Sequence, residues 1–244
     1  MSVFLTAEWR QLLIFNFDVD PDLLLPLVPR GTELDLWRGR AYVSLVGFRF
    51  LRARLLGVPV PFHAAFEEVN LRTYVKRDAD EGLRRGVAFV KEIVPKPAVA
   101  FVARWVYDEP YVTLPTAYRV EPSNDDGPDC TTVEYRWRLS GTWNVMRAAI
   151  IGPPQVLVPG SEEEFVTEHY WGYTALATGG SREYRVEHEP WTTLRAASPE
   201  LRCDALALYG RSFADAMGGE PASAFFAQGS PVKVYRGRVL PTRA

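Results

Sequence analysis

The sequence contains only two cysteines, Cys130 and Cys203, in 244 residues. Small secreted proteins that depend on disulfides carry many more cysteines in a much shorter chain. Neither residue belongs to a Cys-x-x-Cys pair, the spacing that structural zinc sites and redox sites use. We therefore expect two reduced thiols, with Cys203 the one that lies in the core.

Long hydrophobic runs are also missing. A membrane-spanning helix needs about 18 or more apolar residues in succession, and the longest candidate, Ala98 to Val106, is interrupted by Arg104. The first residues, MSVFLTAEWRQ, have neither the basic start nor the cleavage pattern of a signal peptide. The sequence thus predicts a cytoplasmic protein without a membrane partner.

Neither sign of charge is in large excess, because the formal net charge is -2. Proteins that bind nucleic acids usually gather a basic excess on one face. The basic stretch from Arg49 to Arg54 is short, and acidic residues elsewhere balance it. We expect no nucleic-acid partner.

Motifs of several enzyme classes are absent. The sequence has no Gly-x-Ser-x-Gly elbow, no Gly-x-Gly-x-x-Gly or Walker motif, and no His-Glu-x-x-His motif. The three histidines, His63, His169 and His188, form no i, i+4 pair. These absences argue against a serine hydrolase, a nucleotide-dependent enzyme and a helical metal site, so we expect no cofactor and no metal.

Short strand-like segments dominate what the sequence does contain. All-β domains of about 200–250 residues often form one unit, and no linker or repeat divides residues 1–244. We predict one domain of the α+β class, a β-rich antiparallel barrel or sandwich with roughly ten strands and a few short helices. The predicted strands are 12–17, 33–37 and 41–50 (a hairpin), 66–75, 86–94, 112–121, 131–140, 182–186 and 231–239. The predicted helices are 23–28 after the cap Asp20, 98–107, a helix from the cap Ser161 to about 171, and one that begins near Ser198.

One predicted strand, residues 66–75, carries a row of polar side chains. Successive side chains of a strand point to opposite faces, so Glu68, Asn70 and Arg72 share a face opposite an apolar one. That face is either solvated or lines the inside of a small barrel that can hold one ligand. In the second case, a carboxylate, an amide and a guanidinium in a row can orient a polar ligand.

The strand at 86–94 adds a lysine and a glutamate. Strict alternation would place Lys91 with Val87, Phe89 and Ile93 on one face, and Glu92 with Ala88, Val90 and Val94 on the other. A buried lysine with a lowered pKa can form a Schiff base. The alternative is that Lys91 pairs with an acid or reaches solvent.

The segment from Phe66 to Val75 resembles the hallmark stretch of the DUF2071 (YqjF-like) family. Further likenesses cover nearly the whole chain, at Trp9–Pro29, Lys91–Pro95, Glu168–Tyr170 and Arg236–Arg238. The resemblance implies a fold similar to that of acetoacetate decarboxylases, which build a β-rich, barrel-like domain around a small pocket. It implies the fold more than the chemistry.

Acetoacetate decarboxylases use a Schiff-base lysine helped by a second lysine, an acidic residue and an arginine. The resemblance places Arg10 at the pocket arginine and Glu68 at the pocket glutamate. Arg104–Pro110 matches the segment that leads to the lysine pair, but the next two residues are Tyr111 and Val112. The resemblance therefore implies that the Schiff-base amine is missing and that Tyr111 takes its space.

These observations predict a small-molecule pocket protein, namely an enzyme that acts without a metal on a carbonyl or carboxylate compound. The alternative is a non-catalytic ligand-binding or sensor protein, and the sequence is also compatible with a homo-oligomer. Glu68 is the acid–base candidate and Lys91 the candidate for a relocated Schiff base. The candidate substrate-binding residues are Arg10, Asn70, Arg72, Tyr111 and His169, with the two arginines holding an anionic group.

Overall fold

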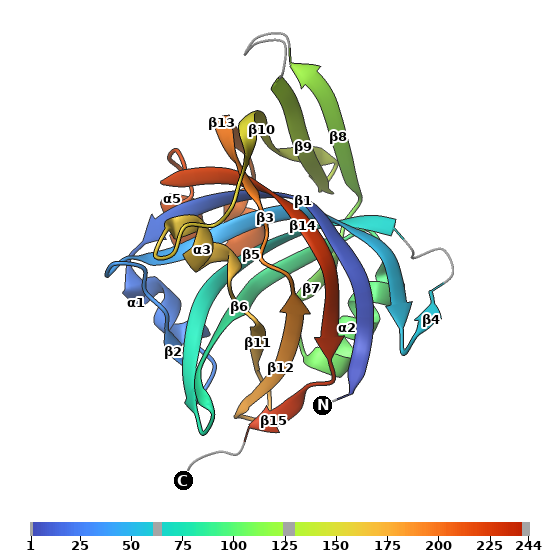
Figure 1. Ribbon diagram of the computed structural model, residues 1–244, viewed down its shortest axis with the longest axis vertical. Coiled ribbons are helices and arrows are strands. Elements are labelled where there is room, and N and C mark those ends of the chain that lie inside the picture. Colours follow the sequence, from blue (N-terminus) through green and yellow to red (C-terminus); the bar gives the residue numbers. More distant parts are fainter. Residues whose placement is uncertain (1, 61–64, 124–129, 241–244) are drawn as a thin grey trace.

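The computed structural model describes residues 2–60, 65–123 and 130–240, so His63 lies outside the described residues. Strands make up most of the described chain (Figure 1). The strands are β1 Val3–Val19, β2 Glu33–Leu34, β3 Ala41–Leu55, β4 Val58–Pro59, β5 Ala65–Ala79, β6 Gly82–Val94, β7 Tyr111–Thr113, β8 Thr116–Ser123, β9 Cys130–Leu139, β10 Thr142–Gln155, β11 Trp171–Ala175, β12 Ser181–His188, β13 Thr193–Arg202, β14 Ser223–Tyr235 and β15 Arg238–Leu240. The helices are α1 Pro21–Leu24, the 3-10 helix η1 Leu25–Leu27, α2 Pro97–Tyr107, α3 Glu162–Thr167, α4 Ala205–Tyr209 and α5 Arg211–Ala216.

The strands form one continuous, strongly curved sheet. Its order is β15-β12-β11-β6-β5-β3-β1-β14-β13-β10-β9-β8, and β12 pairs with β14 as well. That extra pairing joins the two ends of the run β12-β11-β6-β5-β3-β1-β14, so this part of the sheet, the curled section, closes on itself. Strands β13, β10, β9 and β8 continue from it as a second layer. The fold is therefore sandwich-like rather than a true barrel, and the predicted β-rich α+β class is confirmed.

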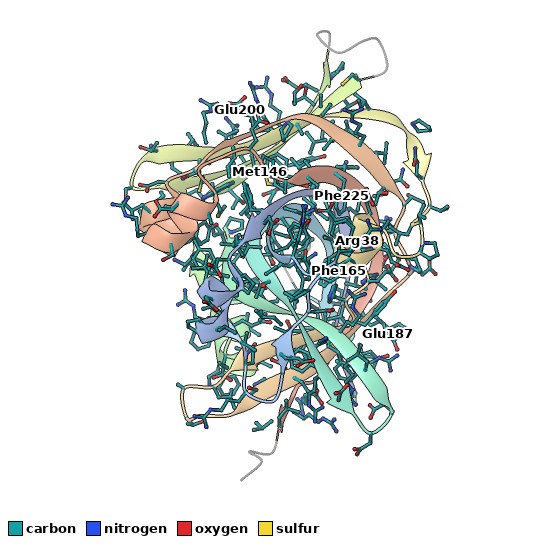
Figure 2. The ribbon with its side chains drawn as sticks, turned by 90° about the vertical axis from the view of Figure 1, so that its left-hand side faces the viewer. Arg38, Met146, Phe165, Glu187, Glu200 and Phe225 are labelled. Carbon is teal, nitrogen blue, oxygen red and sulfur yellow. The ribbon has the colours of Figure 1, made fainter. Side chains whose placement is uncertain are left out.

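The central strands are buried on both faces. Leu13, Phe15 and Phe17 of β1 pack toward β9, β10 and helices α4 and α5, whereas Leu12 and Ile14 pack inside the curled section. This double burial explains why residues 12–17 form an unbroken apolar run, as predicted for a buried strand. Figure 2 shows Phe165 and Phe225 inside the molecule and Glu187 and Glu200 at its margin.

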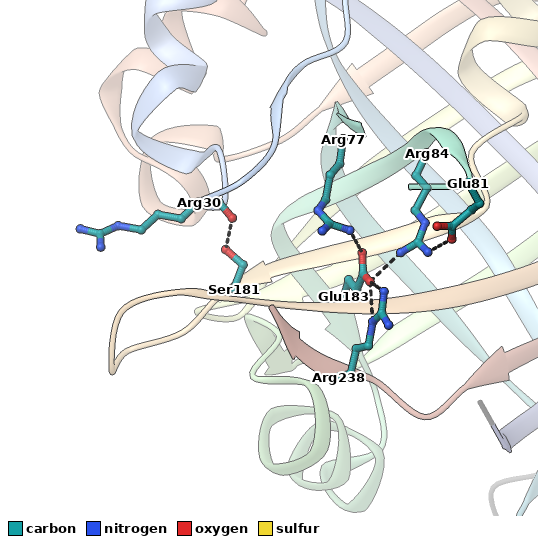
Figure 3. A network of polar contacts seen from close by, with 7 residues as sticks. All are labelled: Arg30, Arg77, Glu81, Arg84, Ser181, Glu183 and Arg238. Carbon is teal, nitrogen blue, oxygen red and sulfur yellow. Dashed lines mark hydrogen bonds and ion pairs between the residues drawn. The ribbon is translucent and has the colours of Figure 1, made fainter. Parts of the chain in front are cut away.

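A buried ion cluster ties β15 and β12 to β5 and β6 (Figure 3). Glu183 of β12 is fully buried and accepts hydrogen bonds from Arg77, Arg84 and Arg238. Arg84 also pairs with Glu81, and its guanidinium lies 3.9 Å from the centre of the Trp171 ring. The three arginines satisfy the Glu183 carboxylate where water cannot reach it.

Several predicted elements are confirmed, with their caps. Asp20 accepts from the backbone N–H of Asp22 at the start of α1, and Ser161 accepts from that of Glu164 at the start of α3. Helix α2 covers the predicted 98–107. Helix α3 ends at Thr167 rather than near 171, because β11 begins at Trp171.

Three local predictions are wrong. The single strand predicted at 112–121 is two strands, β7 and β8, which pair with β6 and β9. The hairpin of 33–37 with 41–50 does not form, since β2 pairs with β5 and only the bridge from Trp37 to Arg40 remains of it. The helix near Ser198 is a strand: β13 runs through Pro199, where Ser198 has a φ of 48° and the register with β10 shifts. A bulge of this kind accommodates a proline that a regular ladder would reject.

The remaining sequence expectations concern cysteines and membranes. Both cysteines are free, but Cys130 is buried and Cys203 only half-buried, so the choice of Cys203 as the core thiol was wrong. Among the residues that the structure describes, no helix has the length and apolar character to cross a membrane.

Candidate functional site

The curled section encloses a cavity of about 200 Å³. Its walls are mainly apolar and aromatic, and they come from β1, β3, β5, β6, β12, β14 and one face of helix α2. The aromatic members are Phe4, Trp9, Phe48, Phe50, Phe66, Phe89, Tyr107, Tyr111 and Tyr184. A concave, mostly apolar space with a few polar groups is the usual form of a small-molecule site.

Strand β5 supplies the predicted polar row. Glu68, Asn70 and Arg72 all line the cavity, and they are 2%, 2% and 9% exposed. The neighbours Val69 and Leu71 point into the opposite core beside β9 and β10. Of the two interpretations left open by the sequence, a solvated face or an enclosed one, the structure has the enclosed one.

A bulge in β6 decides which of its side chains reach the cavity. Asn70 pairs with Glu92 and Leu71 with Lys91, but Arg72 pairs with Phe89, so Val90 is the extra residue. The bulge lets both Phe89 and Glu92 line the cavity, although strict alternation would separate them. The predicted grouping of Phe89 with Lys91 on one face was therefore wrong.

The turn after helix α2 brings two more polar residues. Asp108 caps α2 in the left-handed conformation, with a φ of 58°, and Glu109 and Tyr111 follow on the cavity side. The Arg104 side chain donates to the Tyr111 carbonyl at 2.6 Å, and β7 pairs with β6 so that Tyr111 lies beside Glu92. Three carboxyl groups from three segments thus meet in one cavity.

Two phenol hydroxyls and an amide donate hydrogen bonds to two of these three carboxyl groups. Glu68 accepts from the Asn70 amide at 3.0 Å and from the Tyr111 hydroxyl at 3.2 Å. The Tyr184 hydroxyl donates to Glu109. Each of these bonds is buried, where a hydrogen bond is stronger than in water.

Burial raises the pKa of all three carboxyl groups. It raises the pKa of Glu68 to about 7, although the hydrogen bonds from Asn70 and Tyr111 and the charge of Arg72 act in the opposite direction. Burial and the nearby Glu68 raise the pKa of Glu109 to about 8. The pKa of Glu92 lies well above its ordinary value because of burial and the two neighbouring carboxyls.

Some buried polar atoms of the cavity have no protein partner. They include two acceptors, Glu92 Oε2 and Asn70 Oδ1, and two donors, Arg72 Nε and Trp9 Nε1. Buried polar atoms are normally hydrogen-bonded, so each exception asks for an explanation.

Arg10 does not join this group, which corrects the sequence prediction. Trp9 of β1 lines the cavity, and the side chain of Arg10 takes the other side of the strand. There it donates to Glu8 and to the Gly229 carbonyl, each at 2.9 Å. Arg72 is the one cation that lines the cavity in the described chain, and its Nη2 donates to the Val166 carbonyl at 3.3 Å.

Lys91 and His169 lie elsewhere. The Lys91 ammonium donates to the Leu208 carbonyl of helix α4, on the far side of β6. His169 is buried between Tyr74 and Phe165, with Nε2 at 3.5 Å from Asp35, and burial lowers its pKa to about 4. The chain has four lysines, at 76, 91, 96 and 233, and none lines the cavity as far as the structure describes it.

The sequence interpretation missed Glu92, Glu109 and Tyr184 as site residues. For Glu92 a signal existed, because it interrupts an apolar strand on the face opposite Lys91. Glu109 sits in a turn and Tyr184 in a distant strand, so no local pattern connects them to Glu68. Across the described residues, no group of three or more His, Cys, Asp or Glu side chains is arranged to hold a metal ion.

Acid–base chemistry is what this arrangement can do. Neighbouring carboxyls whose pKa values are raised toward neutrality allow one group to give a proton while another takes one. The apolar walls leave the three carboxyls poorly solvated, which keeps their pKa values high.

Sequence comparison supports the resemblance seen in the strand at 66–75. The DUF2071 family model, described as an uncharacterized conserved protein, matches residues 6–231. A curated relative, the uncharacterized protein YqjF of Bacillus subtilis (strain 168), is 42% identical over 195 residues, which are 79% of this chain and 76% of the relative.

Solved structures with a similar fold share little sequence with this chain. An acetoacetate decarboxylase from Legionella pneumophila has a TM-score of 0.69 at 14% identity, over 98% of this chain and 87% of that one. The enduracididine biosynthesis enzyme MppR, complexed with the condensation product of pyruvate and imidazole 4-carboxaldehyde, has a TM-score of 0.67 at 13% identity, over 100% and 92%. An acetoacetate decarboxylase-like enzyme from Sphingomonas wittichii RW1 has a TM-score of 0.63 at 15% identity, over 99% and 94%.

Proposed function

The chain belongs to the DUF2071 family, and we propose that its cavity is the active site of a metal-independent enzyme that moves protons on a small carbonyl compound. The observation that carries this proposal is the meeting of Glu68, Glu92 and Glu109 in one apolar cavity. The similarity in fold to an acetoacetate decarboxylase and to MppR, which was solved with a condensation product of pyruvate, supports the substrate class.

Glu68 is the base of this scheme. Its pKa is about 7, and its carboxylate accepts from Asn70 and Tyr111 near the charge of Arg72, whereas Glu109 accepts from Tyr184 alone. At neutral pH a large fraction of Glu68 is therefore ionised and can take a proton from the carbon next to the carbonyl.

Glu109 is the acid. With a pKa of about 8 it holds its proton at pH 7 and can give it to the carbonyl oxygen. The carbon–hydrogen bond breaks, its electron pair forms the carbon–carbon double bond of an enol, and the carbonyl oxygen becomes a hydroxyl. In the reverse transfer the protonated Glu68 returns a proton to the carbon and Glu109 takes back the hydroxyl proton, which regenerates the ketone. Deuterium reaches the carbon when the proton held by Glu68 has exchanged with solvent in between.

No imine takes part in this scheme. Tyr111 occupies the space that the family resemblance gives to the Schiff-base amine, and a phenol cannot condense with a carbonyl. Lys91 points away from the cavity toward Leu208. Incubation with pyruvate and borohydride is expected to leave the intact mass unchanged, and an adduct that disappears in Lys91→Ala would contradict this step.

Deuterium exchange tests the proposal directly. Pyruvate, acetoacetate and 2-pentanone in D₂O are expected to exchange their α-protons faster with the protein present, as read by NMR. Glu68→Gln should slow that exchange by about 10²–10⁴-fold, the usual contribution of a general base. Glu67→Gln is the matched control, since Glu67 is the adjacent residue, faces away and accepts from Thr116.

Metal analysis completes the test. We expect protein purified without a histidine tag to contain less than stoichiometric zinc or iron and still to catalyse the deuterium exchange of the carbonyl compounds. Treatment with a chelator should leave that activity unchanged. Activity that disappears with the metal would contradict the metal-independent scheme.

A non-catalytic ligand-binding protein is the second candidate. The apolar and aromatic walls favour it, because they supply affinity whether or not a reaction follows. It predicts that a bound carbonyl compound keeps its α-protons in D₂O in the wild type.

A further inference from the structure

We infer that the ligand of the cavity carries a primary ammonium group, which Glu92 and Asn70 bind. This inference rests on the proposed function only in placing the ligand in the same cavity, and it narrows the substrate class to amino-substituted carbonyl compounds.

The cavity is lined by more acidic groups than basic ones. Three carboxyls line the cavity, against one guanidinium, that of Arg72. Arg72 already uses one of its N–H groups in a hydrogen bond to the Val166 carbonyl. None of the four lysines reaches the cavity in the described residues. A buried carboxyl either keeps its proton, as the raised pKa values of these three indicate, or pairs with a cation. A cationic ligand is therefore the partner that would let one of them ionise.

Two buried oxygen atoms of the cavity have no hydrogen-bond partner in the described protein. Glu92 is 1% exposed and Asn70 2%, and Glu92 Oε2 and Asn70 Oδ1 lack a donor in the protein. The identity of Asn70 Oδ1 as the free acceptor follows from its amide nitrogen, which donates to Glu68. The two residues are direct partners across β5 and β6, so their side chains lie next to each other.

A ligand with several N–H donors at one end would satisfy both oxygen atoms. A primary ammonium has three donors and no acceptor, so it can bond both free oxygens. The aromatic rings of the wall, such as Trp9, Phe48 and Tyr107, add faces that attract a cation. The two unpartnered donors, Arg72 Nε and Trp9 Nε1, leave room for the acceptor oxygen of a carbonyl or carboxylate in the same ligand.

Binding of a cation also changes protonation in a defined way. The titratable and charged groups that face the cavity are Glu68, Glu92, Glu109, Tyr107, Tyr111, Tyr184 and Arg72. An ammonium ion that enters beside a protonated carboxyl favours the ionised form, so that carboxyl releases its proton to solvent. The balance is one bound cation for one proton released, and a neutral ligand would release none.

The experiment compares three small probes by isothermal titration calorimetry at pH 7. The probes are n-butylammonium, the neutral 1-butanol, and tetramethylammonium, which is a cation without N–H donors. We expect n-butylammonium to bind at least tenfold more tightly than either of the others. Titrations in buffers of different ionisation enthalpy should give close to one proton released per n-butylammonium bound.

Variants locate the effect. Glu92→Gln keeps the shape of the protonated side chain but cannot ionise, so it should weaken n-butylammonium binding at least tenfold and leave 1-butanol unchanged. Glu67→Gln, on the opposite face of β5, should leave both unchanged. The proton count in the wild type needs no variant, so the inference can fail even if Glu92→Gln folds poorly.

Three outcomes would overturn the inference: 1-butanol binds as tightly as n-butylammonium, n-butylammonium does not bind, or no proton is released. Deuterium exchange of 2-pentanone in spite of such an outcome would leave the proposed enzyme standing with a neutral substrate. Ammonium binding without any exchange would leave the ammonium site standing and remove the enzyme.

Discussion

Two buried glutamates in the same curled sheet differ in what surrounds them. Glu183 of β12 is fully buried, and three arginines donate to its carboxylate. Glu92 of β6 is 1% exposed, has two other carboxyls as neighbours, and has one oxygen without a partner. Arginines therefore surround the buried carboxylate of Glu183, whereas the neighbours of Glu92 are other carboxyls.

Their pKa values move in opposite directions for that reason. Burial alone would raise the pKa of Glu183, but the hydrogen bonds from Arg238 and Arg84 outweigh it and lower the pKa. Around Glu92, burial and repulsion act together and raise the pKa. The first arrangement holds elements together, whereas the second stores carboxyl groups that can exchange protons, which is typical of functional sites.

The largest expected effect comes from breaking the ion cluster. Glu183→Gln removes the charge that three guanidiniums share, so the free energy of unfolding should fall by about 3–5 kcal/mol, the usual cost of removing one partner of a buried pair. Urea denaturation at pH 7 measures it. Glu92→Gln is the matched control and should not reduce stability, because the amide resembles the protonated carboxyl; an equal loss in both variants would contradict the comparison.

The pH dependence of stability should separate the two regions next. The pKa of Glu68 is about 7 in the folded protein against an ordinary 4.5, so the folded state binds the extra proton. The contribution of Glu68 to the free energy of unfolding is complete below about pH 4.5 and is lost as the pH rises through 7. At 1.36 kcal/mol per pKa unit, this loss is on the order of 3 kcal/mol for Glu68 alone.

The contribution of Glu183 to stability depends on pH in the opposite direction. Its lowered pKa means that its contribution is present above the ordinary pKa and is lost as the pH falls below it. Denaturation curves from pH 3 to 8.5 should show both losses in the wild type. Glu68→Gln should reduce only the loss at rising pH, to which Glu92 and Glu109 still contribute, and Glu183→Gln should reduce only the loss at falling pH. One variant that reduces both losses would show that the regions are not independent.

The smallest expected effect concerns a single hydrogen bond. Tyr111→Phe removes one of the two hydrogen-bond donors to Glu68, so Glu68 loses one of the three groups that favour its ionised form. We expect a loss of about 1 kcal/mol in stability at pH 8 and a higher pH midpoint for the alkaline loss. Phe48→Leu changes the same wall without touching a carboxyl, and it should leave that midpoint unchanged.

The sequence could predict the cavity side of β5 but not the whole site. Glu68, Asn70 and Arg72 follow a regular period of two, which neighbouring residues alone determine. Glu92 was placed with the wrong neighbours because one extra residue, Val90, breaks that period, and a bulge depends on the partner strand.

Long-range pairing explains the other misses. Glu109 meets Glu68 only because α2 and the turn after it fold back onto β6, and Tyr184 comes from β12. Arg10 was assigned to the cavity by resemblance, yet Trp9 occupies the inward position of β1. In the same way, β2 pairs with β5 rather than with the nearby β3, a choice that no local turn signal records.

The closure of the curled section has a consequence for synthesis of the chain. Strand β1 pairs with β14, with Val3 opposite Tyr235, and β12 pairs with β14 from Val186 to His188. Both contacts need residues that leave the ribosome more than 200 positions after β1. While the chain is being made, the apolar inner face of β1 and β3 has no partner on one side, so a nascent chain exposes it for seconds. The cavity can therefore close only after β14 has been made, near the end of synthesis.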